Sequence, residues 1–195
     1  MDRQEKVVCA FCGAIHEVKA YSHIDVSSSP ELKARVLDGT LFTWECPSCG
    51  KVNLARYPLL YHDPDASLMI ILSDARLNAE ELPEGYTARQ VCSVGDLIEK
   101  VRIFDAGLDD IVIEMCKYVT LQETGRDLAL RFVKLDGADG EMTFTYPDKG
   151  RMEMLVLGFN VYEDCAGILR RNPSILNDVS GLARIDAEWL RKFFG

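Results

Sequence analysis

The segment CAFCG at residues 9–13 recurs as CPSCG at residues 46–50, and this repeat decides how the first third of the chain folds. Two residues between cysteines allow both sulfur atoms to face one ion while the chain reverses, and the glycine relieves crowding in the turn. Paired Cys-x-x-Cys segments, here called the first and second knuckle, are typical of zinc sites. We therefore predict one structural zinc ion, bound by Cys9, Cys12, Cys46 and Cys49.

Two other interpretations of the knuckles carry less weight. A redox Cys-x-x-Cys normally begins a helix after a strand, whereas both knuckles are followed by extended sequence. Four unrelated core cysteines would not repeat one five-residue pattern. Four thiolates complete a tetrahedral shell and leave no position for water or substrate, so this zinc would be structural. Replacement of one thiolate by His16 or His23 would reopen a catalytic role.

The segment between the knuckles is longer than in common zinc ribbons. Cys12 and Cys46 are separated by 33 residues, against about 15–20 in the usual spacing. Ser29 and Pro30 predict a helix start and Gly39 a helix end, so we expect a helix at 30–38 inserted between two β arms. Further strands are expected to about residue 72. Residues 1–73 are therefore predicted to form a zinc-ribbon-like antiparallel β domain with a helical insertion.

The rest of the chain changes its periodicity twice. Residues 74–90 are polar, contain Pro83 and Gly85, and predict a linker. Apolar residues at helical spacing across 97–104 and 108–119 predict a helix pair, begun by a capping box at 93–96. Apolar alternation within 128–156 predicts a three-stranded antiparallel sheet. With helices expected at 162–171 and 186–194, residues 91–195 are predicted to form an α+β region, and the whole chain is assigned to the α+β class.

The two knuckles and their surroundings resemble one known family. The second knuckle has the form Cys-Pro-x-Cys, a helix-bearing insert separates the two, and YPLLYHD follows at residues 57–63. Together they resemble the bacterial and archaeal CpXC family over residues 7–72, with a weaker likeness to about residue 120. The resemblance implies a presumed zinc-binding domain without an established activity. It also implies the same four cysteines as ligands and no catalytic residue.

Several other polar residues were considered as functional candidates. His62 and Asp63 are candidates for an acid–base pair, but the segment HDPD at 62–65 is better explained as a turn with side chains that cap backbone groups. Asp109, Asp110 and Glu114 are candidates for a cation site. At helical spacing they are better explained as a solvated acidic face near a helix N-terminus.

The remaining three cysteines do not belong to either knuckle. Cys92, Cys116 and Cys165 are scattered along the chain, and we predict that they are buried as small apolar side chains rather than reactive thiols. The total of seven cysteines is odd, and the N-terminus is charged without an apolar core. Both observations argue against a secreted disulfide framework. We expect a cytoplasmic protein.

Composition limits the classes of function. The net charge of −9 disfavours nonspecific nucleic-acid binding, and no apolar stretch approaches the roughly 18 residues of a membrane span. Phosphate-binding loops and the sequence motifs of serine hydrolases and HExxH metalloproteases are absent from the sequence. We therefore predict a noncatalytic, zinc-stabilised module that binds another protein or a second copy of itself.

Two other functions are consistent with the sequence. A nucleic-acid-binding ribbon would require five basic residues to converge on one face: Lys19, Lys33, Arg35, Lys51 and Arg56. An enzyme would require a pocket between the ribbon and the C-terminal region, with His62 beside carboxylates.

Overall fold

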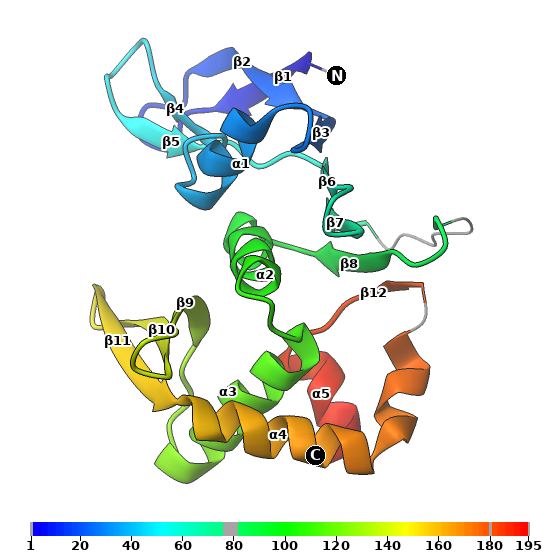
Figure 1. Cartoon of the computed structure of the whole chain (residues 1–195). Helices are drawn as coiled ribbons and strands as arrows, with labels where there is room; N and C mark the ends of the chain where they lie inside the picture. The colour runs from blue at the N-terminus through cyan, green and yellow to red at the C-terminus, as the bar shows by residue number, and fades with distance from the viewer. Residues whose placement is uncertain (1, 76–81, 180, 195) are drawn as a thin grey trace. The chain divides into compact units, whose positions relative to one another are not determined.

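The computed structural model describes residues 2–75, 82–179 and 181–194, and divides the chain into two compact units, residues 1–98 and 99–195. The fold is α+β, as predicted (Figure 1). In the described residues no helix is both long and apolar enough to cross a bilayer. Of the expected linker at 74–90, residues 76–81 lie outside the described residues, and Thr87–Val91 forms strand β8. Domain boundaries at 73 and 91 remain predictions.

Two antiparallel hairpins carry the knuckles in the N-terminal unit. The first hairpin pairs β1 (Asp2–Val8) with β2 (Ile15–Tyr21), and the second pairs β4 (Thr43–Glu45) with β5 (Val52–Leu54). Each knuckle is the turn of one hairpin. Helix α1 (Pro30–Leu37) occupies the insertion between them, as predicted.

Helix α1 begins and ends where its sequence signals indicate. Pro30 is its first residue, where a missing amide costs no hydrogen bond, and Ser29 is the N-cap residue, although its side chain accepts no capping bond. Gly39 follows the helix with φ +80°, a left-handed conformation that favours glycine. Val36 is fully buried and anchors the helix to its unit.

A further sheet of the N-terminal unit is separate from the two hairpins. Within the N-terminal unit its strand order is β8-β7-β6-β3 (Figure 1). Its central pair is antiparallel, whereas β3·β6 and β7·β8 are parallel, a feature that the sequence pattern did not indicate. Tyr61 and Ile70 alternate with half-buried neighbours and lie in the core. The strands not yet bounded are β3 (His23–Asp25), β6 (Leu59–Asp63) and β7 (Leu68–Leu72).

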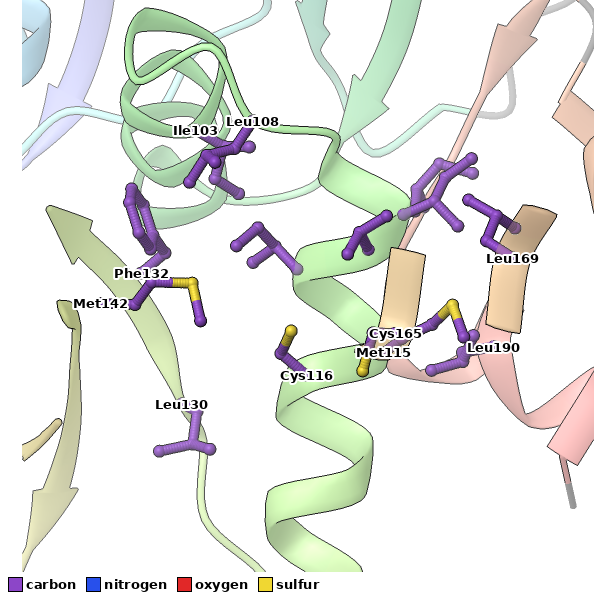
Figure 2. Close-up of a cluster of buried hydrophobic side chains, with 14 of the residues drawn as sticks. Ile103, Leu108, Met115, Cys116, Leu130, Phe132, Met142, Cys165, Leu169 and Leu190 are labelled. Carbon is purple, nitrogen blue, oxygen red and sulfur yellow. The ribbon is translucent and has the colours of Figure 1, made fainter. Parts of the chain in front are cut away.

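The C-terminal unit contains the predicted antiparallel sheet and helices. Its strand order is β11-β10-β9. Figure 2 shows the buried cluster, in which Cys116 and Cys165 lie among Phe132, Met142 and Leu190. The predicted burial of Cys116 and Cys165 is therefore confirmed, while Cys92 in the other unit is only half-buried. The elements are α2 (Val94–Asp105, which spans the unit boundary), α3 (Asp110–Thr124), β9 (Arg131–Asp136), β10 (Glu141–Asp148), β11 (Arg151–Gly158), α4 (Phe159–Arg171), a 3-10 helix (Pro173–Val179), β12 (Leu182–Ala183) and α5 (Ala187–Phe194).

Local capping chemistry starts the helices of the predicted pair. Ser93 Oγ accepts a hydrogen bond from the Asp96 amide at 3.1 Å, which is the serine half of the expected capping box at the start of α2. The Asp96 carboxylate accepts from the Ser93 hydroxyl at 2.6 Å. Asp109 is the N-cap of α3, where its Oδ1 accepts from the Ile111 amide at 2.8 Å.

The expectation of a solvated acidic face on α3 is wrong for Asp110 and Glu114, which are both buried. Lys100 Nζ lies 2.7 Å from Asp110 Oδ2. Lys117 Nζ lies 2.7 Å from Glu99 Oε1 and 2.8 Å from Glu114 Oε1. Lys100 comes from α2, so the periodicity of α3 alone could not show that Asp110 is paired inside the unit, whereas Lys117 lies one turn from Glu114 on α3 itself.

Lys117 holds two carboxylates inside this unit. Burial raises the pKa of Glu114, although Lys117 and Lys100 oppose that effect. Desolvation disfavours the charged form of Lys117, yet the Glu99 and Glu114 carboxylates outweigh it and raise the pKa of the amine. Glu99 Oε1 also accepts the Phe132 amide at 2.6 Å, which ties α2 to β9.

We predict that Lys117→Met destabilises the C-terminal unit by about 3–5 kcal/mol, because the buried carboxylates of Glu99 and Glu114 lose their ion-pair partner. Lys134→Met is the control, since the exposed Lys134–Asp136 pair should contribute at most about 1 kcal/mol. The free energy of unfolding of both variants is measured by urea unfolding in a Trp44→Phe background, where Trp189 fluorescence reports on the C-terminal unit. Equal urea midpoints for the two variants would contradict the assignment.

Candidate metal centre

The structure brings the four predicted cysteines together. Their Sγ atoms all lie within 4.8 Å of one another. The Cys9–Cys49 sulfur distance is 3.6 Å and the Cys12–Cys46 distance is 3.7 Å, so each short distance joins the two knuckles. A tetrahedral ion with metal–sulfur bonds of about 2.3 Å separates its sulfur ligands by about 3.8 Å. The cysteines therefore have the spacing of a four-sulfur metal site.

Matching backbone turns aim the sulfur atoms. In each knuckle the amide of the first cysteine donates to the carbonyl five residues later at 2.9 Å, and the glycine amide donates back to the carbonyl of that cysteine at 2.9 and 2.8 Å. Gly13 and Gly50 have φ values of +73° and +67°, where an L side chain would be strained. The structure confirms the expected need for glycine after the second cysteine of each pair.

Asn53 joins the two knuckles and was missed in the sequence. Its Nδ2 donates to the Lys51 carbonyl at 2.8 Å and to Cys9 Sγ at 3.4 Å, while its Oδ1 accepts the Ala10 amide at 2.9 Å. Asn53 is buried, whereas its neighbours Val52 and Leu54 on β5 are exposed. A polar residue facing inward between two outward apolar residues is the signal that would have identified it.

The cysteine thiols cannot all lose their protons easily in one cluster. Burial opposes ionisation of Cys9, but hydrogen bonds from the Cys12 and Phe11 amides and from Asn53 lower its pKa to about 6. The Lys51 amide acts to lower the pKa of Cys49, yet burial and the three neighbouring cysteines raise it to about 12. The lowered pKa favours the thiolate of Cys9, and a positive charge among the four sulfur atoms would relieve the effect of the neighbouring cysteines on Cys49.

The two histidines considered as substitute ligands lie in different places. His16 Nε2 is 3.5 Å from Cys46 Sγ and 3.3 Å from Ser48 Oγ, and its ring lies 5.7 Å from that of Trp44. His23 stacks instead on His62, with 5.8 Å between ring centroids. Because all four cysteines converge, His16 is a neighbour of the sulfur cluster rather than a needed replacement.

His62 and Asp63 do not act as a pair. Asp63 Oδ1 accepts the Ala66 amide at 3.2 Å, and its Oδ2 lies 3.0 Å from Lys33 Nζ, which agrees with the expected turn. His62 Nδ1 lies 3.7 Å from Asp25 Oδ2, the residue opposite it on parallel strand β3.

The other nitrogen of His62 has a partner as well. Its Nε2 lies 3.3 Å from the Tyr86 hydroxyl, so contacts on both sides hold the imidazole in one orientation. Burial lowers the pKa of the stacked His23, and the nearby His62 adds to that effect. The rings of His23 and His62 are thus held by contacts with their neighbours. Among the described His, Cys, Asp and Glu side chains, only the four cysteines have the spacing of a metal site.

Most of the basic residues proposed for a nucleic-acid surface have acceptors or rings within their own unit. Lys33 pairs with Asp63, and Arg56 contacts both Asp74 and the Cys92 carbonyl. Lys19 Nζ lies 5.1 Å from the centre of the Tyr21 ring. Arg35 donates to the Thr40 carbonyl at 3.5 Å. Two of the five basic residues, Lys33 and Arg56, are therefore paired with carboxylates.

Comparison with known proteins gives one family match. A family model described as CpXC protein matches residues 7–117, which is more than half of the chain. The matched region includes both knuckles, the insert and helices α1 and α2, in agreement with the resemblance seen in the sequence. No curated protein and no solved structure shows a significant match to the chain.

We predict that Asn53→Ala weakens metal binding by about 10–100-fold, the usual cost of losing a group that orients a ligand. The change removes the hydrogen bond to Cys9 and leaves the Ala10 amide without its acceptor. Competition with a coloured chelator measures the affinity, and Asn172→Ala, which loses one exposed bond to the Ile168 carbonyl, is the control. Equal affinities in wild type and Asn53→Ala would contradict the role given to Asn53.

Proposed function

The chain belongs to the CpXC family, and from this premise we propose that its four cysteines hold one structural zinc ion that fixes a surface for binding another protein. The observation that carries the proposal is the convergence of four sulfur atoms, two from each knuckle, within 4.8 Å. We also propose a cytoplasmic location, because free cysteines in this number suit a reducing compartment.

The donor set favours zinc and a structural role. Four soft sulfur ligands in tetrahedral array select zinc or iron among common metals, and zinc in such a site has no redox chemistry. Four protein ligands also fill the shell, so neither water nor substrate can reach the ion. Chemistry at the metal is therefore not part of the proposal.

The metal would supply stability that the second hairpin lacks. Strands β4 and β5 have only three residues each, and Val52 and Leu54 turn away from the interior. A structural zinc site contributes on the order of 10 kcal/mol of apparent binding free energy, which is folding free energy where the site forms only in the folded state. The knuckles, and the surface beside them, would then depend on the ion for their shape.

The surface proposed for protein binding is the apolar part of the two hairpins. Val8 and Ile15 lie opposite each other at the knuckle end of β1·β2, and Phe11 lies within the first knuckle with 65% of its surface exposed. Exposed large apolar side chains gathered on one small domain are typical of interaction surfaces. The net charge of −9, together with the basic side chains that already have contacts in their own unit, makes a protein a better partner than a nucleic acid.

We predict about one zinc ion per chain in the purified protein, measured by elemental analysis. Cys46→Ser should lose the ion because the tetrahedral shell is then incomplete, and the N-terminal unit should unfold more easily. Cys165→Ser, which alters a buried cysteine of the other unit, should keep the ion. A full complement of zinc in Cys46→Ser, or iron in the wild type, would contradict the assignment.

We predict that Phe11→Asp loses bound protein partners while it keeps its zinc. The substitution places a charge in the proposed surface without touching a sulfur atom. Affinity capture with the tagged full-length chain, compared with Leu176→Asp as an exposed control in the C-terminal unit, measures the effect. Capture of the same proteins by Phe11→Asp and wild type would sink the proposed surface.

A further inference from the structure

The strand β11 lies at an edge of the C-terminal sheet, and its solvent face is apolar. Among the described strands, only β10 pairs with it. Met152, Met154 and Val156 alternate along the strand and are 63%, 73% and 50% exposed. Leu155 and Leu157 point to the other face and pack against the core of the unit. The edge of β11 can therefore accept another strand, and the apolar face beside that edge is exposed.

The hairpin turn determines which backbone groups the edge presents. Lys149 and Gly150 form a two-residue turn with φ values of +47° and +79°, and Asp148 pairs with Arg151 across it. In such a hairpin the flanking pair is hydrogen-bonded, and hydrogen-bonded pairs then alternate with non-bonded ones. The register of β10·β11 is continuous over eight pairs. The amides and carbonyls of residues 152, 154 and 156 thus point outward from the edge.

The opposite edge of the same sheet is protected, whereas β11 is not. Strand β9 carries Arg131, Lys134 and Asp136, and its register with β10 shifts between Thr143 and Phe144. Charges and irregularities of this kind keep sheet edges from pairing with other chains. Strand β11 is eight residues long and contains neither lysine nor proline nor a register shift, and its two charged residues, Arg151 and Glu153, lie at the end next to the turn. A long, regular and apolar edge favours strand addition.

We propose that β11 pairs antiparallel with β11 of a second copy of the chain, about a two-fold axis. A two-fold axis brings identical edges together, so the outward amides of each copy meet the outward carbonyls of the other. Because side chains alternate along strands, the exposed apolar side chains of both copies join on one face. This proposal goes beyond the zinc module, because β11 lies in the unit without the four cysteines.

Local charge supports a second copy as the partner. The chain carries −9 overall, and two identical chains would repel each other if the edge shared that charge. Along the turn and strand, however, Asp148 and Glu153 balance Lys149 and Arg151. The net charge of the turn and strand is thus close to zero, so two β11 edges can approach without strong electrostatic repulsion.

Sedimentation velocity of the zinc-loaded, full-length chain tests the proposal. The mass obtained for the wild type should be twice the 21.9 kDa mass of one chain. Met154→Pro removes one outward amide and should yield monomer, because proline is tolerated on an edge but cannot donate to a new strand. Met154→Thr is the matched control: it also removes the methionine but keeps the amide, so dimer should persist with lower affinity. Equal loss of dimer in both variants, or a monomeric wild type at every concentration, would overturn the proposal.

Two further measurements separate the β11 contact from self-association through the ribbon and from a folding defect of the variant. Phe11→Asp should remain dimeric, since the ribbon surface is not used here; loss of dimer in that variant alone would assign self-association to the ribbon and refute the β11 contact. If Met154→Pro fails to fold, amide hydrogen exchange of the wild type decides. The amides of residues 152, 154 and 156 should exchange more slowly as concentration rises, and rates independent of concentration would refute the proposal.

Discussion

The N-terminal unit depends on the closeness of four sulfur atoms. Sulfur distances of 3.6 and 3.7 Å across the knuckles concentrate groups that repel one another once ionised. Without a cation the cluster favours the protonated thiol at Cys49, whose pKa is raised, although the pKa of Cys9 is lowered. The proposed divalent ion would favour the thiolate form of all four cysteines and would join the two hairpins through them.

The C-terminal unit brings opposite charges together without an ion. Lys117 lies between Glu99 and Glu114, and Lys100 pairs with Asp110, all of them buried. Such pairs contribute little net stability compared with apolar packing, but removal of one member is costly. Two of the contacts, Lys117–Glu99 and Lys100–Asp110, join α2 to α3. The apolar core in Figure 2 contains side chains of both helices, so buried charges and apolar packing hold the same pair together.

Local sequence signals predicted most of the fold. Pro30, Gly39 and Ser93 act within a few residues of their own position, so the ends of α1 and the start of α2 could be predicted. The four cysteines could be predicted as a group because the repeated spacing constrains them. Asn53 and Asp110 could not be understood in this way, because their partners lie on other elements: Cys9 and Ala10 for Asn53, and Lys100 of α2 for Asp110. Lys117 lies one turn from Glu114 on α3, but the burial of this pair beside Glu99 of α2 was not evident from α3 alone. The parallel pairs β3·β6 and β7·β8 were missed for the same reason.

The proposed metal also explains why the second hairpin exposes apolar side chains and buries a polar one. In most small β units the apolar residues of each strand face inward, because their burial supplies the free energy of folding. Here β5 turns Asn53 inward to the knuckles and exposes Val52 and Leu54. A sulfur-bound ion would supply the cohesion of the interior, so apolar side chains need not be buried to fold the hairpin. They remain on the outside, where they can take part in recognition, and their position is only as rigid as the metal site beneath them.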